Sequence, residues 1–401
     1  MTAPKLHFKE FDEDWSKITL GDYSETITSG SRDWAQYYSD SGDKFIRMTN
    51  LVRDGIHLDL SDLKFVELPD DSNEGKRTNL KSGDILISIT AELGKLGWIP
   101  DGLGTAYINQ HTALVRMKEI CDSKFIAYGL STEKYNNKLN SLNDSGAKAG
   151  LNLGTIRNFE VIIPSKKEQT KIASFLSAVD EKISQLSQKL HLLGQYKQGM
   201  MQKLFNQQIR FKADDGSEFG EWGEQKLGEV STTFSGGTPQ STNKDFYQGT
   251  IPFIKSGEIS QKTTEQFINE IALKSSSAKL VQKGDLLYAL YGATSGQVAI
   301  SQIDGAINQA ILCIRSNLNT LYLLNFFLLK KDSILSTYLQ GGQGNLSAAI
   351  LKEILVPIPC LEEQTKIANF LSSIDQKIDV VSEQLEQAKL WKKGLLQQMF
   401  V

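Results

Sequence analysis

The clearest hydrophobic pattern in the chain lies in residues 168–205 and 363–400, where apolar positions recur in steps of three and four. Polar residues fill the positions between them, and neither segment contains proline. This stripe is typical of a long helix that packs on another helix. We therefore predict two long helices that pair through Ile172, Leu176, Val179, Ile183, Leu186 and Leu190 in the first segment and Ile367, Leu371, Ile374, Ile378, Val381 and Leu385 in the second.

The two helical segments are copies of each other, because they align without a gap at an offset of 195 residues. Three further pairs of segments match at offsets of 201, 199 and 195: residues 81–88 with 282–289, 108–116 with 307–315, and 159–164 with 354–359. The whole chain is therefore a tandem duplication of a globular unit followed by a helix. We predict globular domains at 1–165 and 208–360, with helical spacers at 166–207 and 361–401.

Each globular unit has about the size of an ordinary domain, roughly 150 residues. Short apolar runs that follow Gly-Asp turns or Asn-Gln pairs predict strands at 84–89, 112–117, 285–290 and 310–315. Segments with apolar residues on one face predict helices at 123–139 and 319–339. The expected fold class is mixed α/β (α+β), with two domains in tandem and the long helices packed as an antiparallel coiled coil with pseudo-two-fold symmetry.

A helix with an apolar stripe must bury that stripe, and its most economical partner is its own copy in the same chain. Pairing between chains, or with the helices of a partner protein, stays an alternative. Thirty-eight residues at about 1.5 Å each form a rod of roughly 57 Å. This length exceeds one turn of B-DNA, roughly 34–36 Å. The paired helices are therefore predicted to act as a spacer between two similar but non-identical globular units.

Composition restricts the class of protein. Of the 401 residues, 40% are hydrophobic and 23% are charged, and no apolar run is long enough to cross a membrane. The three cysteines, Cys121, Cys313 and Cys360, lie far apart, which favours reduced thiols in a cytoplasmic protein. The four histidines are scattered, so a histidine metal site is not expected. A self-sufficient DNA binder is usually basic, so the net charge of −3 argues mildly against nucleic acid. For a DNA-binding chain, either the binding face is local or a partner supplies much of the grip on phosphate.

The duplicated motif Glu-Gln-Thr-Lys-Ile-Ala-x-Phe-Leu-Ser-x-x-Asp-x-Lys-Ile, which twice follows a strand ending in proline, resembles a known family. It is similar to the specificity (S) subunit of type I restriction–modification enzymes. Further matching segments are Ser-Gly-Gly-Thr-Pro at 235–239, Tyr-Gln-Gly-Thr-Ile-Pro-Phe-Ile at 247–254 and Gly-Gly-Gln-Gly-Asn-Leu-Ser at 341–347. The resemblance covers essentially the whole chain.

The resemblance implies a non-catalytic DNA-targeting subunit that binds no cofactor itself. Each target recognition domain would read one half of a split, asymmetric target in double-stranded DNA, and the helices would set the unread spacer. Two modification (M) subunits would supply adenine methylation from S-adenosylmethionine, and restriction (R) subunits would supply ATP- and Mg-dependent translocation and cleavage. Residues 29–33 and 145–150 depart from the family's glycine-rich patterns, so the two half-sites should differ.

The sequence lacks the motifs that would indicate catalysis by this chain. No Gly-x-x-x-x-Gly-Lys-Ser/Thr phosphate loop is present, and no Asn-Pro-Pro-Tyr/Phe tetrapeptide of an adenine methyltransferase. Pro69-Asp70 with Glu74-x-Lys76 superficially matches a nuclease pattern, but the spacing is too tight for acids on separate strands. The sequence therefore favours a recognition subunit that is not an enzyme by itself.

Residues expected to touch DNA are polar or cationic side chains and glycines in Gly/Ser/Thr-rich loops and nearby strands, since base edges and phosphates require such donors and acceptors. Glycine-rich loops are also common as plain turns, and surface lysines are often only solvated. The motif Ile-Asn-Gln at 108–110 and 307–309 occurs in both copies and is predicted to support the fold or the loop rather than to discriminate sequence. The candidates are Ser29, Gly30, Ser31, Arg32, Lys44, Arg47, Thr90, Lys95 and Lys148 in the first unit, and Gly236, Gly237, Thr238, Lys244, Lys255, Tyr291, Thr294, Ser295, Gln343 and Asn345 in the second.

A second class of function fits the same organisation. Two β-rich modules on a helical rod could form a non-catalytic scaffold that binds other proteins. The slightly acidic charge balance favours this alternative. The salt dependence of any DNA binding separates the two, because phosphate contacts weaken steeply as salt rises.

Overall fold

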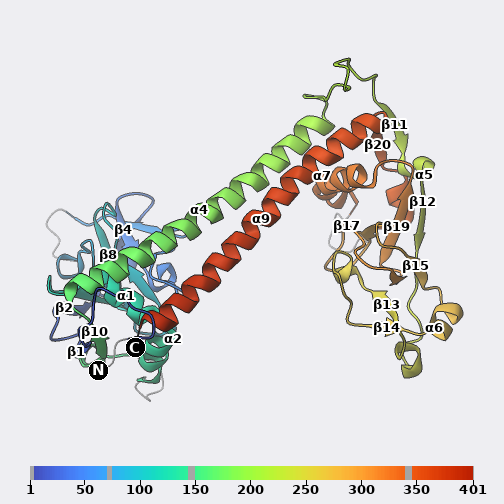
Figure 1. The fold of residues 1–401 in the computed structure, drawn as a ribbon. Coiled ribbons are helices and arrows are strands. Elements are labelled where there is room, and N and C mark those ends of the chain that lie inside the picture. Colours follow the sequence, from blue (N-terminus) through green and yellow to red (C-terminus); the bar gives the residue numbers. More distant parts are fainter. Residues whose placement is uncertain (1–3, 70–74, 143–149, 339–345, 401) are drawn as a thin grey trace. The chain divides into compact units, whose positions relative to one another are not determined.

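The computed structural model describes residues 4–69, 75–142, 150–338 and 346–400. It divides into two compact units, Met1–Leu186 with Gln384–Val401, and Ser187–Glu383. Each unit joins one globular half of the chain to parts of both long helices, α4 (Lys166–Phe205) and α9 (Leu361–Met399) (Figure 1). The units therefore do not follow the order of the chain.

Within each unit the two long helices pack antiparallel. In the first unit, the ring of Phe175 on α4 meets the ring of Trp391 on α9 edge to face, at 6.0 Å. In the second, Lys197 in the second half of α4 binds Asp375 in the first half of α9, with an Nζ–Oδ1 distance of 2.6 Å. The predicted antiparallel pairing of the two helices within the chain is confirmed.

The apolar stripe of each helix packs on a globular core as well as on the other helix. The first part of each stripe is buried in the core of its own unit, together with apolar residues from the last turns of the other helix. The buried sets are Ile172, Leu176 and Val179 with Leu395, Met399 and Phe400 in the first unit, and Ile367, Leu371 and Ile374 with Met201, Leu204 and Phe205 in the second. Farther along the helices, Leu186, Val381 and Leu385 are buried, and Ile183, Leu190 and Ile378 are partly buried.

The first unit contains two four-stranded sheets, a two-stranded ribbon and short helices. One sheet is antiparallel in the order β2 (Ser24–Ser29), β9 (Thr112–Met117), β6 (Ile85–Ser88), β7 (Leu96–Trp98). The other has the order β3 (Tyr38–Ser39), β5 (Lys64–Val66), β4 (Asp43–Ile46), β8 (Ala106–Ile108), with β4 and β8 parallel. The ribbon is β1 (Ser16–Thr19) with β10 (Glu160–Ile163), and the helices are α1 (Ser123–Ser131), α2 (Glu133–Ser141) and α3 (Leu153–Arg157).

The second unit repeats this plan. Its antiparallel sheet has the order β12 (Ser231–Ser235), β19 (Ile311–Ser316), β16 (Leu286–Ala289), β17 (Val298–Ile300). Its second sheet has the order β14 (Phe267–Ile268), β13 (Ile251–Ile254), β18 (Gly305–Ile307), β15 (Lys279–Val281), with β13 and β18 parallel. The ribbon is β11 (Gly223–Lys226) with β20 (Leu355–Ile358), and the helices are α5 (Leu227–Val230), α6 (Glu270–Ser275), α7 (Thr320–Tyr338) and α8 (Ala348–Lys352).

The inner strand β6 is buried on both faces, which explains the continuous apolar run Ile85, Leu86 and Ile87. Ile85 and Ile87 belong to the core that includes α1 and the long helices, whereas Leu86 belongs to the core that includes residues of the second sheet. In β16, Leu286 and Leu287 likewise belong to two different cores. Each antiparallel sheet thus lies between two apolar layers.

The predicted helix at 123–139 is wrong in one respect, because it is broken into α1 and α2. Thr132 between them has an extended backbone, and its hydroxyl accepts a hydrogen bond from the backbone N–H of Tyr135 as a helix cap. The predicted helix at 319–339 corresponds to the unbroken α7, and residue 339 lies outside the described residues.

The repeated Gly-Asp turns have a structural explanation. The buried carboxylate of Asp84 accepts two hydrogen bonds from Arg116, at 2.7 and 2.6 Å, and one from the backbone N–H of Lys81, at 2.7 Å. Asp285 and Arg315 form the same pair in the second unit, at 2.9 and 2.6 Å. These acids therefore join each turn to the neighbouring long strand.

The glutamine of the duplicated helix motif also has the same contacts in both units. Gln169 accepts from the backbone N–H of Asp122 at 2.9 Å and donates to the carbonyl of Pro164 at 2.8 Å. Gln364 makes the equivalent bonds to Asn319 and Pro359, at 2.9 and 2.8 Å. This side chain links the start of each long helix to the strand ending in proline and to the start of α1 in the first unit or α7 in the second.

A buried acid, Asp180 on α4, binds three other parts of the first unit. Its carboxylate lies 2.5 Å from Lys392 Nζ on α9, 2.7 Å from the Tyr128 hydroxyl on α1 and 3.0 Å from His57 Nε2 in a loop. Burial alone raises the pKa of Asp180, but the bonds from His57 and Lys392, the charge of Lys392 and the bond from Tyr128 outweigh it and lower the pKa to about 2.

We expect Asp180→Asn to lower the free energy of unfolding of the first unit by about 2–3 kcal/mol near neutral pH. The stability from Asp180 is fully present above its unfolded pKa of about 3.9 and is lost as the pH falls through about 2, so the difference from wild type should shrink over this range. The matched control is Asp375→Asn, whose half-exposed pair with Lys197 should contribute less than about 1 kcal/mol. Denaturant unfolding at several pH values measures both, and equal losses would contradict the account.

Candidate nucleic-acid interface

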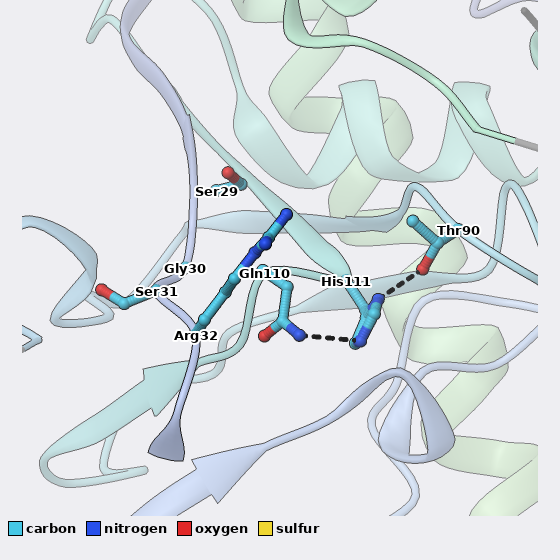
Figure 2. Close-up of a pocket in the computed structure, with 7 residues that line it drawn as sticks. All are labelled: Ser29, Gly30, Ser31, Arg32, Thr90, Gln110 and His111. Atoms are coloured by element: carbon cyan, nitrogen blue, oxygen red, sulfur yellow. Dashed lines mark hydrogen bonds between the residues drawn. The ribbon is translucent and has the colours of Figure 1, made fainter.

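Three loops from distant parts of the chain meet at one end of the antiparallel sheet in the first unit. They are the loop after β2, the loop after β6 and the turn before β9 (Figure 2). Ser31 forms a bridge with Asn109, and Ile89 N–H donates to the carbonyl of His111 at 3.0 Å. Leu151 N–H donates to the carbonyl of Ile89 at 2.9 Å, which brings a fourth part of the chain to the same place.

The second unit has the same backbone frame at this end of its sheet. Gly236 N–H donates to the carbonyl of Asn308 at 3.2 Å, and Leu290 N–H donates to the carbonyl of Ala310 at 2.8 Å. Leu346 N–H donates to the carbonyl of Leu290 at 3.1 Å. The structure therefore gathers residues 29–32 and Thr90 around the turn before β9 in the first unit, and it places Gly236 and Leu290 against the equivalent turn at 308–310 in the second.

The glycines in these loops are required by close backbone contacts. A Cβ atom on Gly30 would lie 2.0 Å from the carbonyl oxygen of Ile108, and one on Gly236 would lie 1.7 Å from that of Ile307. A Cβ on Gly237 would lie 2.5 Å from the Cβ of Ser277. Their small size therefore has a structural reason, and contact of their backbones with DNA stays a prediction.

The asparagine of the shared Ile-Asn-Gln motif shapes the turn before the long strand. Asn109 Oδ1 accepts from His111 N–H at 3.1 Å, and Asn308 Oδ1 accepts from Ala310 N–H at 3.0 Å. Hydrogen bonds of this kind stabilise the local turn. The glutamine that follows each asparagine takes no part in this turn bond.

An open pocket of about 560 Å³ lies among the three loops of the first unit. Gln110 Nε2 lies 3.0 Å from His111 Nε2, and His111 Nδ1 lies 2.7 Å from Thr90 Oγ1 (Figure 2). The guanidinium of Arg77 donates to the carbonyl of Ser29 at 3.1 Å nearby. The lining residues are Ser29, Gly30, Ser31, Arg32, Thr90, Gln110 and His111.

Sequence reasoning passed over three of these residues. The sequence predicts that Gln110 supports the fold or the loop because both copies have it, His111 is one of four scattered histidines, and Arg77 lies far from the loops in sequence. One sequence signal could have identified this position. The residue after the shared glutamine differs between the copies, His111 in one and Ala310 in the other.

The predicted cations fall into two groups. Arg47 is held by Asp62, with two guanidinium bonds of 2.7 Å, and Lys95 forms an ion pair with Glu92. Arg32, Lys44 and Lys244 make no side-chain hydrogen bond or ion pair with the residues that the structure describes. Cations without an acidic partner are the better candidates for phosphate or base contacts, since Arg47 and Lys95 would first have to leave their carboxylates.

The other candidates of the second unit have varied environments. Lys255 follows β13, and its backbone N–H donates to Glu258 at 2.9 Å. Thr238 donates its hydroxyl to Gln309 Oε1 at 2.7 Å, and Ser295 donates to the carbonyl of Leu290 at 3.0 Å. Tyr291 packs partly against the core, and Thr294 has a buried hydroxyl without a partner among the described residues.

Three predicted residues, Lys148, Gln343 and Asn345, lie outside the described residues, as do Asp70 and Glu74 of the nuclease-like pattern. In the described ranges, no group of three or more His, Cys, Asp or Glu side chains could hold a metal ion. None of the helices described is long and apolar enough to cross a membrane. The loops instead present amide, hydroxyl and guanidinium groups, which are the donors and acceptors that pair with base edges.

Comparison with known proteins supports a nucleic-acid role. The family model described as "Type I restriction modification DNA specificity domain" matches residues 12–193 and again residues 220–390. The two matches fall on the two copies of the duplication, and together they cover most of the chain.

Individual relatives agree with this match over nearly full length. The type I restriction enzyme MjaVIII specificity subunit of Methanocaldococcus jannaschii is 26% identical over 422 residues, covering 98% of this chain and 93% of the relative. The crystal structure of a type I restriction–modification system S subunit from M. genitalium has a similar fold, with a TM-score of 0.64, 16% identity and coverage of 100% and 99%. A chain from a structural study of complex assembly and conformational transition of the type I R-M system has a TM-score of 0.56, 16% identity and coverage of 97% and 98%.

Proposed function

Because this chain belongs to the family of type I restriction modification DNA specificity domains, we propose that its two units read the two halves of a split DNA target. The observation that carries the proposal is the shared backbone frame with different side chains. At equivalent positions the first unit has Arg32, Thr90 and His111, where the second has Thr238, Tyr291 and Ala310. One scaffold with two sets of donors and acceptors suits an asymmetric target.

The long helices set the unread spacer between the two half-sites. Both α4 and α9 take part in both units, so each helix connects one reading unit to the other. An α-helix is stiff, and its length is fixed by a rise of about 1.5 Å per residue. The distance between the half-sites in the target therefore follows from the number of helical residues.

The chain targets DNA for partner subunits that perform the chemistry. Two methyltransferase subunits use S-adenosylmethionine to methylate adenine in the target, and restriction subunits use ATP and Mg to translocate and cleave DNA in the cytoplasm. The relative from M. jannaschii, which matches over nearly its full length, is a subunit of a type I restriction enzyme, and this supports the assignment. Partner subunits also explain how a chain with a net charge of −3 operates on DNA.

The proposal is tested by binding of the assembled chain and its methyltransferase partner to DNA at several salt concentrations. Because each neutralised phosphate releases counterions, the logarithm of the binding constant should fall linearly with the logarithm of salt. Duplexes that carry the split target should bind about 10³-fold or more tightly than random duplexes at physiological salt. Binding without salt dependence or sequence preference would favour the protein-binding scaffold.

A further inference from the structure

We propose that the shared glutamine, Gln110 in the first unit and Gln309 in the second, reads one base in each half-site with a different hydrogen-bonding pattern in each unit. This inference rests on the proposed function and specifies which residue discriminates the base. The two glutamines occupy the same place in the turn that precedes β9 or β19. Their side-chain amides form hydrogen bonds with different neighbours. These bonds determine which donors and acceptors of each glutamine remain available to a base.

In the first unit, the neighbour His111 holds the amide nitrogen. The short distances link Gln110 Nε2 to His111 Nε2 and His111 Nδ1 to Thr90 Oγ1. A neutral imidazole with its proton on Nδ1 satisfies both hydrogen bonds, because Nδ1–H donates to Thr90 Oγ1 and Nε2 accepts from the amide of Gln110. Figure 2 shows the amide oxygen of Gln110 turned away from His111, so the oxygen and one N–H remain for a ligand.

In the second unit, the neighbour Thr238 holds the amide oxygen. Its hydroxyl donates to Gln309 Oε1 at 2.7 Å, and Ala310 replaces the histidine and offers no side-chain partner for the nitrogen. Gln309 is exposed, so both hydrogens of its Nε2 remain for a ligand. Thr238 occupies the position of Arg32 in the first unit, so both neighbours of the glutamine differ between the copies.

The two patterns suit different bases in the major groove. An acceptor beside a donor matches adenine, which presents the N6 amino group beside the N7 acceptor. A pair of donors matches guanine, which presents O6 and N7 as two adjacent acceptors. Gln110 is therefore assigned to an adenine of the first half-site, and Gln309 to a guanine of the second.

The roles of the neighbours follow from these contacts. His111 and Thr90 are positioning residues, because they act on the base through Gln110. Arg32 lines the same pocket as Gln110, and its replacement by threonine together with His111→Ala would copy the second unit (Figure 2). If the neighbours of the shared glutamine set its specificity, a duplicated chain can read a different base in each half-site with the same glutamine in both units.

The experiment uses the full chain assembled with its methyltransferase partner, acting on duplexes in which one half-site at a time is randomised. Methylated molecules are sequenced to obtain the base preference at every position. The variants are Gln110→Ala, the double variant Arg32→Thr with His111→Ala, and the matched control Gln309→Ala. The other positions of the same half-site control for folding of the altered unit, and the other half-site controls for assembly of the complex.

Gln110→Ala should reduce the preference for adenine at one position of the first half-site by about tenfold or more and leave its other positions unchanged. The double variant should move that position from adenine to guanine, and Gln309→Ala should relax one position of the second half-site only. An unchanged first half-site in Gln110→Ala would overturn the inference, as would a double variant that keeps adenine.

Two further outcomes separate this inference from other failures. A Gln110→Ala variant that loses preference at every position of the first half-site would give the glutamine a structural role and overturn the inference. A wild-type complex that methylates DNA without any split preference would instead overturn the proposed function on which the inference rests.

Discussion

Exchange of residues 1–165 for the same region of another specificity subunit is expected to replace one half of the recognised sequence and to leave the other half unchanged. Each unit has its own sheets, cores and converging loops, so its reading surface does not depend on the loops of the other. Methylation mapping of cells that carry the hybrid measures both half-sites at once. The reciprocal exchange of residues 208–360 should alter only the other half.

The structure adds a condition to this exchange. The N-terminal region contacts the end of α9 through the Leu6 N–H bond to the carbonyl of Gln398, at 3.0 Å, and through the rings of Phe125 and Phe400, 5.0 Å apart. A hybrid should therefore retain compatible residues at 384–401, or it will lose stability for a reason unrelated to reading. A hybrid with intact stability that changed both half-sites would contradict the modular account.

Insertion of one heptad into each long helix, after residue 188 in α4 and after residue 383 in α9, is expected to lengthen the spacer without altering either half-site. Seven residues add about 10 Å to a helix, which corresponds to about 3 base pairs of B-DNA. A whole heptad keeps the apolar stripe in register. The spacer is read directly from the methylated motif, and an unchanged spacer would contradict the role of the helices as a ruler.

The matched control for the heptad insertion is the same insertion in α4 alone. The ion pairs of Asp180 with Lys392 and of Lys197 with Asp375 lie in different units and link the same two helices. If one helix is lengthened and the other is not, both pairs cannot form with a straight α4. We expect this variant to be less stable and less active than the variant with both helices lengthened.

The sequence predicted the long helices and the duplication because the two copies could be compared with each other. The same comparison matches Trp15 with Trp222 but misses the segments that precede these two residues. Phe8 packs on Phe175 with ring centroids 5.9 Å apart, and Phe211 packs on Phe370 at 5.6 Å. The repeat therefore extends to these segments, but the distance to the following tryptophan is 7 residues in one copy (8 to 15) and 11 in the other (211 to 222), which hides the match.

Other features depend on contacts that no local pattern encodes. Glu363 is buried and accepts two bonds from Arg210, at 3.0 and 2.8 Å, and one from Trp222, at 2.8 Å. The matching Glu168 is also buried, and burial raises the pKa of its carboxyl. Identical motifs thus have different electrostatic environments, because the partners come from segments that differ between the copies.

The candidate site was predictable in its loops and not in its details. Composition predicts the loops at 29–32, 90–95, 236–238 and 291–295. The structure places residues 29–32 and Thr90 around one pocket in the first unit, and Gly236 and Leu290 against one turn in the second. The roles of Gln110 and His111 needed three-dimensional structure, since a shared residue gains a distinct chemistry only from its neighbours. The sequence did not predict that each long helix is divided between two units. A heptad pattern shows that a helix face is buried, but it does not show which residues pack against that face.

The most direct test of the central claim is base-resolution mapping of adenine methylation in cells with and without this gene, with the cognate methyltransferase expressed in both. The account predicts that one split, asymmetric motif is methylated only when the gene is present. An identical pattern of methylation in the two strains would contradict it.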